Sequence, residues 1–268
     1  MIARVQINPA WWEFIRNSIR QAQIYRFQFL SYLVFLCVQI FLLRTVWMGV
    51  YDGRDSVDGV SPDALLVYIT VSTLQGLIGP YQIAYAIQVR VETGQVANDL
   101  IRPFGFLSQM IASQFGKTIG RSTFLIVVTP AAMFIGSLRM PDVANIGPYV
   151  LSLTLGYFVN LLIWLLVGLL SFWMMHVNGV RAILGISSDF LAGAVIPLWF
   201  MPDALRTVLE FLPFQAGVFL PTSIFMGQVT GSDLIRPLVV QIAWIVLLSL
   251  VVRVVWRNAQ RRIVVQGG

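Results

Sequence analysis

Residues 151–175 read LSLTLGYFVNLLIWLLVGLLSFWMM, a run that contains no formally charged side chain. A helix needs about 20 predominantly apolar residues to cross a bilayer, so this run predicts a transmembrane helix, which we place at residues 149–175. The whole chain has the same character, because 57% of its 268 residues are hydrophobic, 11% are charged and the mean hydropathy is +0.79. These values lie outside the usual balance of a soluble domain. The sequence therefore predicts an all-α polytopic membrane protein.

Five further apolar blocks bring the predicted number of transmembrane helices to six. Gly79 and Pro80 interrupt the second block near its middle, where the proline removes a backbone donor and should kink the helix. Pro130 lies inside the third block and Pro197 inside the fifth. The predicted spans are residues 27–50, 64–88, 120–138, 149–175, 182–200 and 234–256.

Two segments flank these spans. Residues 1–26 predict an amphipathic helix at the membrane interface, with Asn8 as a suitable N-cap and Pro9 at the first helical position. The apolar positions at helical spacing are Trp12, Ile15, Ile19 and Ala22, and the arginines fall largely on the other side. Residues 257–268 form a basic tail.

Between the fifth and sixth spans, residues 201–231 contain two shorter apolar pieces. They read DALRTVLEFLPF (203–214) and AGVFLPTSIFMG (216–227). At a rise of about 1.5 Å per residue, neither piece is long enough to cross a hydrocarbon core of about 30 Å as a helix. We therefore expect a re-entrant pair of half-helices.

The distribution of charge predicts the orientation of the chain. Six spans place both termini on one side of the membrane, and the positive-inside rule assigns that side to the cytoplasm. With this orientation, most of the 18 basic residues fall in cytoplasmic segments, whereas the acidic residues gather outside. The loop of residues 89–119, between the second and third spans, is then cytoplasmic.

This loop contains RVETGQVANDLIRPF at residues 90–104, in which Gly94 and Pro103 flank a possible short helix. Asp99 and Arg102 are spaced to form an ion pair on such a helix. A short helix with apolar and charged groups is suited to dock on another protein, and it is equally suited to lie on lipid headgroups. The residues alone leave both interpretations open.

Motifs that would carry chemistry are missing. FGKT at residues 115–118 resembles the end of a phosphate-binding loop, but the pattern GxxxxGK[ST] requires a glycine where the chain has Ile111. His176 is the only histidine and Cys37 the only cysteine, so we predict no metal site and interpret His176 as a residue at the membrane boundary. No catalytic residue and no cofactor bound by this chain are predicted.

Polar residues inside predicted spans are a second group of candidates. Asp189 is costly to bury in a membrane, so it is either satisfied by Ser187, Ser188 or Asn160, or it lines a substrate path or a proton site. The amides are cheaper and are explained by hydrogen bonds between helices. The possible intramembrane polar sites are Gln39, Gln75, Asn160 and Asp189.

Two stretches resemble a known family. ETGQVANDLIRPF (92–104) resembles the cytoplasmic loop of bacterial ABC-2 type permeases, with an acidic residue, a glycine and a leucine-rich turn closed by arginine and proline. IPLWFMPDALRTVLEFLPFQAGVFLPTSIFMGQVTG (196–231) is similar to the stretch between spans five and six of that family. The order and the sidedness of the segments agree with this resemblance over nearly the whole chain.

The resemblance implies the permease subunit of an ATP-binding cassette exporter in the bacterial cytoplasmic (inner) membrane. The permease would pair with a second permease chain, identical or related, and with a separate cytoplasmic ATP-binding subunit that holds ATP and Mg²⁺. The contact with that subunit would include Glu92, Gly94, Asp99, Leu100, Arg102 and Pro103. An outer gate would be shaped by Pro202, Pro213, Phe214 and Pro221.

Other classes of membrane protein remain alternatives. A secondary transporter would use Asp189 and the proline-broken spans. A membrane assembly factor that transports nothing would share every feature described above, whereas an intramembrane enzyme would need a catalytic pair that the sequence lacks. The substrate stays open among drugs, lipids, peptides and glycans.

Overall fold

The computed structural model describes residues 9–24, 26–57, 59–102, 104–136, 140–174 and 176–266. Most of these residues are helical, and within these ranges the only strand-like pairing is a single antiparallel bridge between Val57 and Val60. The predicted all-α class is therefore confirmed. The α-helices are α1 (Pro9–Ile24), α2 (Arg26–Tyr51), α3 (Pro62–Leu77), α4 (Gln82–Glu92), α5 (Gln95–Leu100), α6 (Phe106–Ser122), α7 (Leu125–Gly136), α8 (Val143–Leu169), α9 (Asn178–Leu191), α10 (Asp203–Phe211), α11 (Phe219–Phe225) and α12 (Ile235–Gln266). Short 3₁₀ segments are η1 (Leu170–Phe172), η2 (Leu198–Phe200), η3 (Pro213–Gly217) and η4 (Gly231–Leu234).

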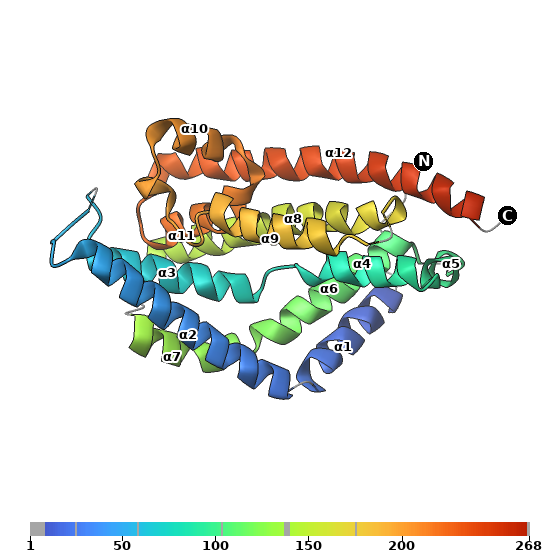
Figure 1. Ribbon diagram of the computed structural model, residues 1–268, viewed down its shortest axis with the longest axis horizontal. Helices are drawn as coiled ribbons and strands as arrows, with labels where there is room; N and C mark the ends of the chain where they lie inside the picture. Colours follow the sequence, from blue (N-terminus) through green and yellow to red (C-terminus); the bar gives the residue numbers. More distant parts are fainter. Residues whose placement is uncertain are drawn as a thin grey trace.

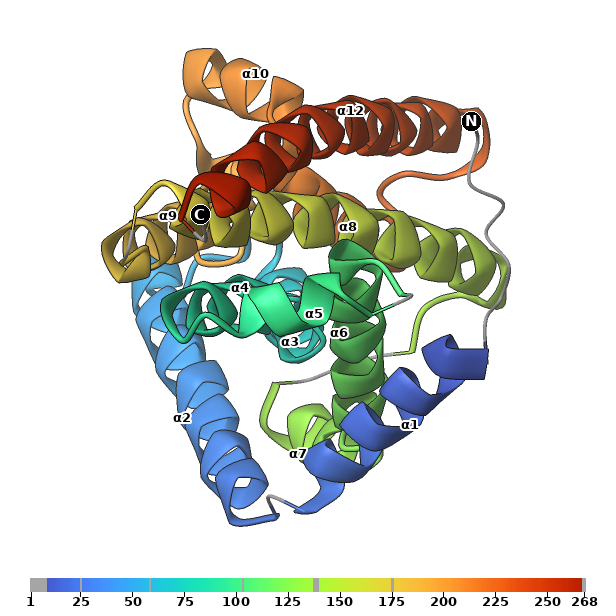
Figure 2. The same ribbon diagram turned by 90° about the vertical axis from the view of Figure 1, so that its right-hand side faces the viewer.

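Helix α8 is the centre of the bundle. It packs against α4, α12, η3 and α11, while α2, α3 and α7 form a second group of mutually packed helices. Figures 1 and 2 show α12 lying along α8, with α3 and α4 on the other side of α8. The largest apolar core joins α4, α6, α8 and α12, and includes Ile87, Phe106 and Trp164. Because the described ranges contain no sheet, the packing among them is helix on helix.

The second predicted span is interrupted where the sequence indicates. Helix α3 begins at Ser61, whose Oγ accepts a hydrogen bond from the Ala64 amide at 3.3 Å, followed by Pro62 at the first position. It ends at Leu77, and α4 resumes at Gln82 beyond Gly79 and Pro80. The break gives two helices that run nearly end to end (Figure 1).

Four helical segments are long and apolar enough to cross a membrane among the described residues: Val34–Tyr51, Pro62–Glu92, Val143–Phe172 and Gly231–Arg262. The blocks predicted as the third and fifth spans form shorter helices, α7 and α9. A turn at Thr123 and Phe124 separates α7 from α6, and α9 ends before Gly193, which adopts a left-handed conformation with φ of 78°. The structure thus supports a multi-pass membrane protein, and the six-span count stays a prediction.

The predicted cytoplasmic loop contains a helix that the sequence interpretation missed. Helix α6 packs against α1 so closely that a Cβ on Gly116 would lie 2.5 Å from the carbonyl oxygen of Ile15. The hydroxyls of Ser18 and Ser113 hydrogen-bond at 3.0 Å across this contact. Helix α1 therefore has a protein neighbour, while its Trp12 side chain is exposed. The predicted N-cap, Asn8, lies outside the described residues.

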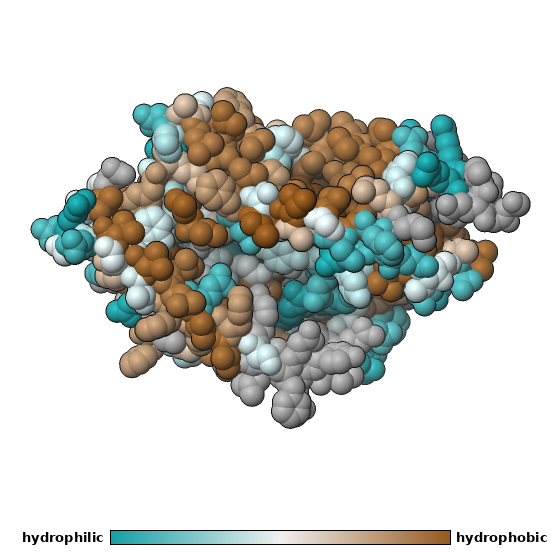
Figure 3. Space-filling model, viewed as in Figure 1, coloured by the Kyte–Doolittle hydropathy of each residue, from teal (hydrophilic) through white to brown (hydrophobic). Residues whose placement is uncertain are grey.

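The two ends of the molecule are more polar than the face between them. Helix α5 and the last turns of α12 lie at one end, and α10, α11 and the connection between α2 and α3 lie at the opposite end (Figure 1). Apolar side chains cover much of the face between them, and polar ones gather at both tips (Figure 3). Helix α12 continues through the predicted basic tail as far as Gln266.

Candidate functional site

Helix α5 follows α4 after a two-residue turn. Thr93 closes α4, and Gly94 adopts φ of 70° and ψ of 4°, a left-handed conformation that glycine reaches at little cost. The carbonyl of Gly94 accepts a hydrogen bond from the Ala97 amide at 3.2 Å. The predicted Gly94 thus sets the direction in which α5 leaves α4.

Asp99 holds α5 against α4. Its side chain is only 7% exposed, and its Oδ2 accepts a hydrogen bond from Nε of Arg90 at 2.9 Å. The guanidinium of Arg102 lies 3.4 Å from Oδ1, so the pairing predicted from the i, i+3 spacing is confirmed. Because two cations flank this buried carboxylate, Asp99 positions the helix from within and does not face outward.

The exposed surface at the end of α5 and in the turn after it includes Leu100, Ile101 and Arg102, which we name the α5 tip. Gln95, Ala97 and Asn98 of α5 are exposed as well. Ile101 is 83% exposed, and Leu100 is also exposed. The Arg102 side chain keeps half of its surface open despite its contact with Asp99. Pro103, predicted at the same contact, lies outside the described residues. An exposed isoleucine beside an arginine forms a small mixed surface of the kind that docks on a protein.

The residues after the α5 tip are tied to α1 and α6. The ring of Phe104 stacks on Phe14 with centroids 5.6 Å apart, and Trp11 meets the same ring edge-on at 6.4 Å. Gln109 donates from Nε2 to the carbonyl of Phe104 at 2.7 Å. These contacts join segments far apart in sequence, and the sequence analysis did not single them out.

Glu92 connects α4 to the turn before α9. Its Oε1 accepts hydrogen bonds from Nε2 of Gln88 at 2.7 Å and from Nδ1 of His176 at 3.0 Å. The bond from Gln88, followed by the bond from His176, lowers the pKa of the Glu92 carboxyl. Arg181 of α9 lies 3.4 Å from Oε1 of Gln88 and stacks over the Tyr85 ring. The interpretation of His176 as a mere boundary residue therefore misses its contact with Glu92.

The FGKT segment lies within helix α6 and not in a loop before a helix. Its backbone amides take part in helical geometry and cannot form the cradle that a phosphate-binding loop requires. Burial, and then the charges of Arg121 and Arg90, lower the pKa of the Lys117 ammonium. Among the residues that the structure describes, no three His, Cys, Asp or Glu side chains lie close enough to hold a metal ion.

The polar residues of the predicted spans fall into different environments. Gln75 is buried and joins three helices, because its Oε1 accepts from Thr222 at 3.2 Å and its Nε2 donates to Tyr149 at 3.5 Å. The amide of Asn160 lies where a Cβ on Gly217 would be. Gln39 is half-buried on α2.

Asp189 lies on the exposed side of α9. It is flanked by the exposed side chains of Ile186 and Phe190. Within the described ranges no hydrogen bond joins its carboxylate to Ser187, Ser188 or Asn160, and the Ser188 hydroxyl donates to the Gly185 carbonyl instead. The Asp189 carboxylate is thus exposed at the surface of the chain and does not bond to any of the three side chains expected to satisfy it.

A buried glutamine that the sequence analysis did not single out joins α8, α12 and η3. Gln241 is fully buried and donates from Nε2 to the carbonyls of Ser152 at 3.0 Å and Ala216 at 2.9 Å. The Ser152 hydroxyl donates back to Oε1 at 3.2 Å. The available signal was a lone amide in an apolar run, which indicates a hydrogen bond between helices.

The residues predicted to shape an outer gate lie within or just before α10, η3 and α11, in the segment predicted to be re-entrant, which we call the re-entrant segment. Pro202 is exposed at the start of α10, and Pro213 is buried at the first position of η3. Phe214 packs beside the cluster that joins α8, η3 and α12. Pro221 is buried in the first turn of α11, where its missing amide hydrogen leaves no helical bond unmade.

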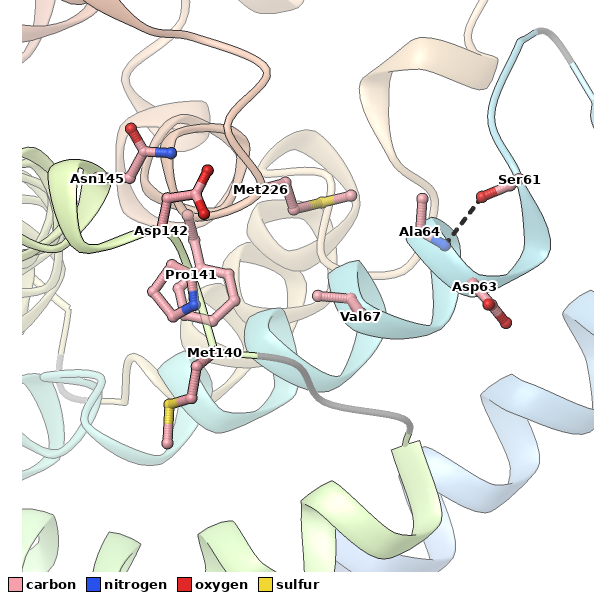
Figure 4. A pocket seen from close by; sticks show the side chains of 10 residues that line it. Ser61, Asp63, Ala64, Val67, Met140, Pro141, Asp142, Asn145 and Met226 are labelled. Atoms are coloured by element: carbon pink, nitrogen blue, oxygen red, sulfur yellow. Dashed lines mark hydrogen bonds between the residues drawn. The ribbon is translucent and has the colours of Figure 1, made fainter.

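A cavity of about 350 Å³ lies beside this segment. Ser61 and Asp63 from the start of α3 line one side of it, and Asp142 and Asn145 from the start of α8 line another (Figure 4). Met226, just after α11, lies between the two groups. The cavity therefore marks where three helix ends meet.

Long apolar helices and a buried network of amides define a multi-pass α-helical membrane protein. Residues 28–267 match the family described as "ABC-2 family transporter protein". Because the match covers nearly the whole chain, the chain belongs to this family, and the resemblance drawn from residues 92–104 and 196–231 is confirmed. No curated protein gives a significant match to the chain. Members of this family are membrane components of transport systems.

Proposed function

We propose that this chain is the transmembrane permease subunit of an ATP-binding cassette exporter, driven by a separate cytoplasmic ATPase subunit that binds ATP and Mg²⁺. The family supports a role in membrane transport. The observation that carries the proposal is the α5 tip, where exposed Ile101 and Arg102 directly follow a helix anchored from within by Asp99. A docking element needs both an open surface and an anchor to the bundle, and α5 has both.

The contacts of α5 provide three routes by which movement of the ATPase would reach the bundle. The ion pair of Asp99 with Arg90 connects α5 to α4. Phe104 contacts α1 and α6, and Glu92 at the end of α4 contacts His176 just before α9. ATP binding would shift the bundle between two arrangements only as far as ATP binds the complex more tightly in one arrangement than in the other. Alternating access by a dimer of permease chains is the mechanism that we propose.

The proposed orientation places α5 and the end of α12 in the cytoplasm of a bacterial cell, at the inner membrane. The charge distribution supports this side. The re-entrant segment then faces outward, and the buried turns around Pro213, Phe214 and Pro221 would serve as the outer gate. The substrate would leave on that side.

The decisive experiment replaces the α5 tip. The double variant Ile101→Asp, Arg102→Glu should reduce co-purification with the ATPase at least tenfold in mild detergent, because it removes an apolar contact and reverses a charge. Both side chains are exposed, but the new carboxylate at position 102 would lie near the buried Asp99, so a small decrease of the melting temperature is expected, without unfolding at the temperature of the assay. Arg257→Glu reverses the charge of an exposed residue on α12 and is the matched control, which should co-purify with the ATPase as the unchanged chain does.

Unchanged association together with unchanged coupling of ATP hydrolysis to transport would refute the assignment. The observation that favours a secondary transporter is the exposed carboxylate of Asp189 on α9. Transport that needs no ATPase and stops in an Asp189→Asn variant would establish that alternative instead.

A further inference from the structure

The re-entrant segment and the start of α12 enclose a cavity of about 760 Å³. Helices α10 and α11, the turns η3 and η4, and the first turns of α12 all contribute side chains to its wall. This volume lies in the range of pockets that hold small organic ligands. The lining of the cavity contains four charged side chains, which we name the rim, and a group of apolar side chains, which we name the wall. Uncharged polar side chains complete the lining: Gln215, Ser223, Gln228 and Ser232.

The rim consists of two cations and two carboxylates: Arg206, Glu210, Asp233 and Arg236. Nε of Arg206 donates to Oε1 of Glu210 at 3.1 Å, whereas Arg236 lies 3.9 Å from Oε2 and its side chain is 81% exposed. Exposed ion pairs of this kind contribute little stability, so their members are available to pair with a ligand. The rim carries no net charge but offers both signs at short range.

The wall is apolar and continues along α12. Phe219 is buried, while Trp199, Leu220 and Val240 are half-buried around the cavity. Val239 of α12 is exposed, and further exposed apolar side chains follow it along the same helix. The rim lies where the apolar stretch of α12 begins, which is the level at which a bilayer changes from headgroups to hydrocarbon.

We propose that this cavity binds one zwitterionic phospholipid of the surrounding bilayer, of the phosphatidylethanolamine type. The phosphate would bind Arg206 and Arg236 in place of their present contacts with Glu210, since arginine forms directed hydrogen bonds to phosphate oxygens. The ammonium would pair with Glu210 and Asp233, and an acyl chain would pack against Val239 and Val240. A headgroup that carries one positive and one negative charge can pair with both the arginines and the carboxylates of the rim. An anionic headgroup has no cation for the carboxylates and would be repelled by them. The proposal does not depend on the ATPase.

The experiment measures lipid retained by the full chain after purification in mild detergent from vesicles of equal phosphatidylethanolamine and phosphatidylglycerol content. Native mass spectrometry should show about one phosphatidylethanolamine per chain, in preference to phosphatidylglycerol. The double variant Arg206→Gln, Arg236→Gln should lower this retention at least tenfold. Arg253→Gln, at an exposed position further along α12, should retain lipid as the unchanged chain does.

A second pair of variants tests the wall. Val240→Trp fills the cavity and should also abolish retention, whereas Val246→Trp, an exposed position of α12 outside the cavity, should not. Equal retention in all variants, preference for phosphatidylglycerol, or cross-linking of the rim to a second copy of this chain would each overturn the proposal. The wall variants keep the test decisive even if the double arginine variant fails to fold.

Discussion

The α5 end and the re-entrant end of this protein are held together by different interactions. At the α5 end, charged pairs and ring contacts join the helices, as between Arg90 and Asp99. At the re-entrant end, η3 is held to α8 and α12 by amides bonded to backbone carbonyls and by a close approach at a glycine, as at Gln241 and Gly156. The ion pairs at this end lie in the exposed rim of the cavity. The difference follows from the surroundings. The Arg90 side chain is 30% exposed, so water competes for it and weakens its pair with the buried Asp99, whereas polar groups enclosed in an apolar environment have to be satisfied by the protein itself.

We therefore expect the re-entrant end to be the rigid part of the bundle and the α5 end to be the adjustable part. The coupling role proposed for α5 requires it to move with its partner, and a contact with one partly exposed member, such as Arg90, permits this at lower cost than a fully buried one. Four substitutions test this comparison, and we expect the largest effects at the re-entrant end.

The largest effect should come from Gly156→Ala. A Cβ at this position of α8 would overlap the carbonyl oxygen of Ala216, which belongs to the backbone and cannot move aside easily. Overpacking of this kind should destabilise the protein by about 3 kcal/mol. Thermal unfolding in detergent measures it. Gly49→Ala in α2, where nothing lies within 4 Å of the added carbon, is the control and should leave the melting temperature unchanged or raised.

Gln241→Leu should have the next largest effect. The leucine fills a similar volume but leaves the carbonyl of Ala216 and the hydroxyl of Ser152 without the bonds that they make now. The loss should be about 2 kcal/mol, the cost of unsatisfied buried polar groups. Gln39→Leu on α2 should change the stability much less, and equal losses in the two variants would contradict the proposed role of the Gln241 network.

At the α5 end, Asp99→Asn should have a smaller effect on stability. It weakens the pair with Arg90, whose side chain is 30% exposed, so a loss of about 1 kcal/mol is expected. Hydrogen exchange of residues 95–101 should increase, because α5 is then less firmly held. Arg102→Gln removes only the more exposed partner of Asp99 and should leave this exchange nearly unchanged. Protection of α5 that survives Asp99→Asn would show that other contacts anchor it.

The smallest effect should come from His176→Gln and should depend on pH. Hydrogen bonds from Gln88 and His176 lower the folded-state pKa of Glu92, so their stabilising effect is present above the ordinary carboxyl pKa of about 4.3 and is lost as the pH falls through the lowered pKa. Melting curves between pH 7 and pH 3 measure this. The acid-side decrease should be smaller in His176→Gln and smallest in Glu92→Gln, and a decrease equal to that of the unchanged chain in both variants would contradict the role of this pair.

The sequence predicted more of the helices than of their contacts. Hydrophobic runs indicated the long helices, and Gly79 and Pro80 indicated the break between α3 and α4. Helix α6 was missed, because its mixed apolar and polar sequence carries no membrane signal and its helical form is supported by packing against α1. The short α7 and α9 were predicted as full spans, since composition does not show where a turn such as that at Gly193 ends a helix.

The candidate residues show the same division. The spacing of Asp99 and Arg102 was enough to predict their pairing, because a helix brings residues three apart together. The partner of His176 could not be predicted, because Glu92 is distant in sequence and only the fold brings it within 3.0 Å.

By itself, the sequence determined the all-α class, the membrane environment and the family, since these follow from hydrophobicity and short local patterns that need no long-range contact. Only the tertiary structure decided which polar groups meet. Hydrogen bonds such as that from Gln241 to Ala216, and the rim that Arg206 and Arg236 form across a cavity, depend on the relative placement of helices, which packing over the whole bundle determines.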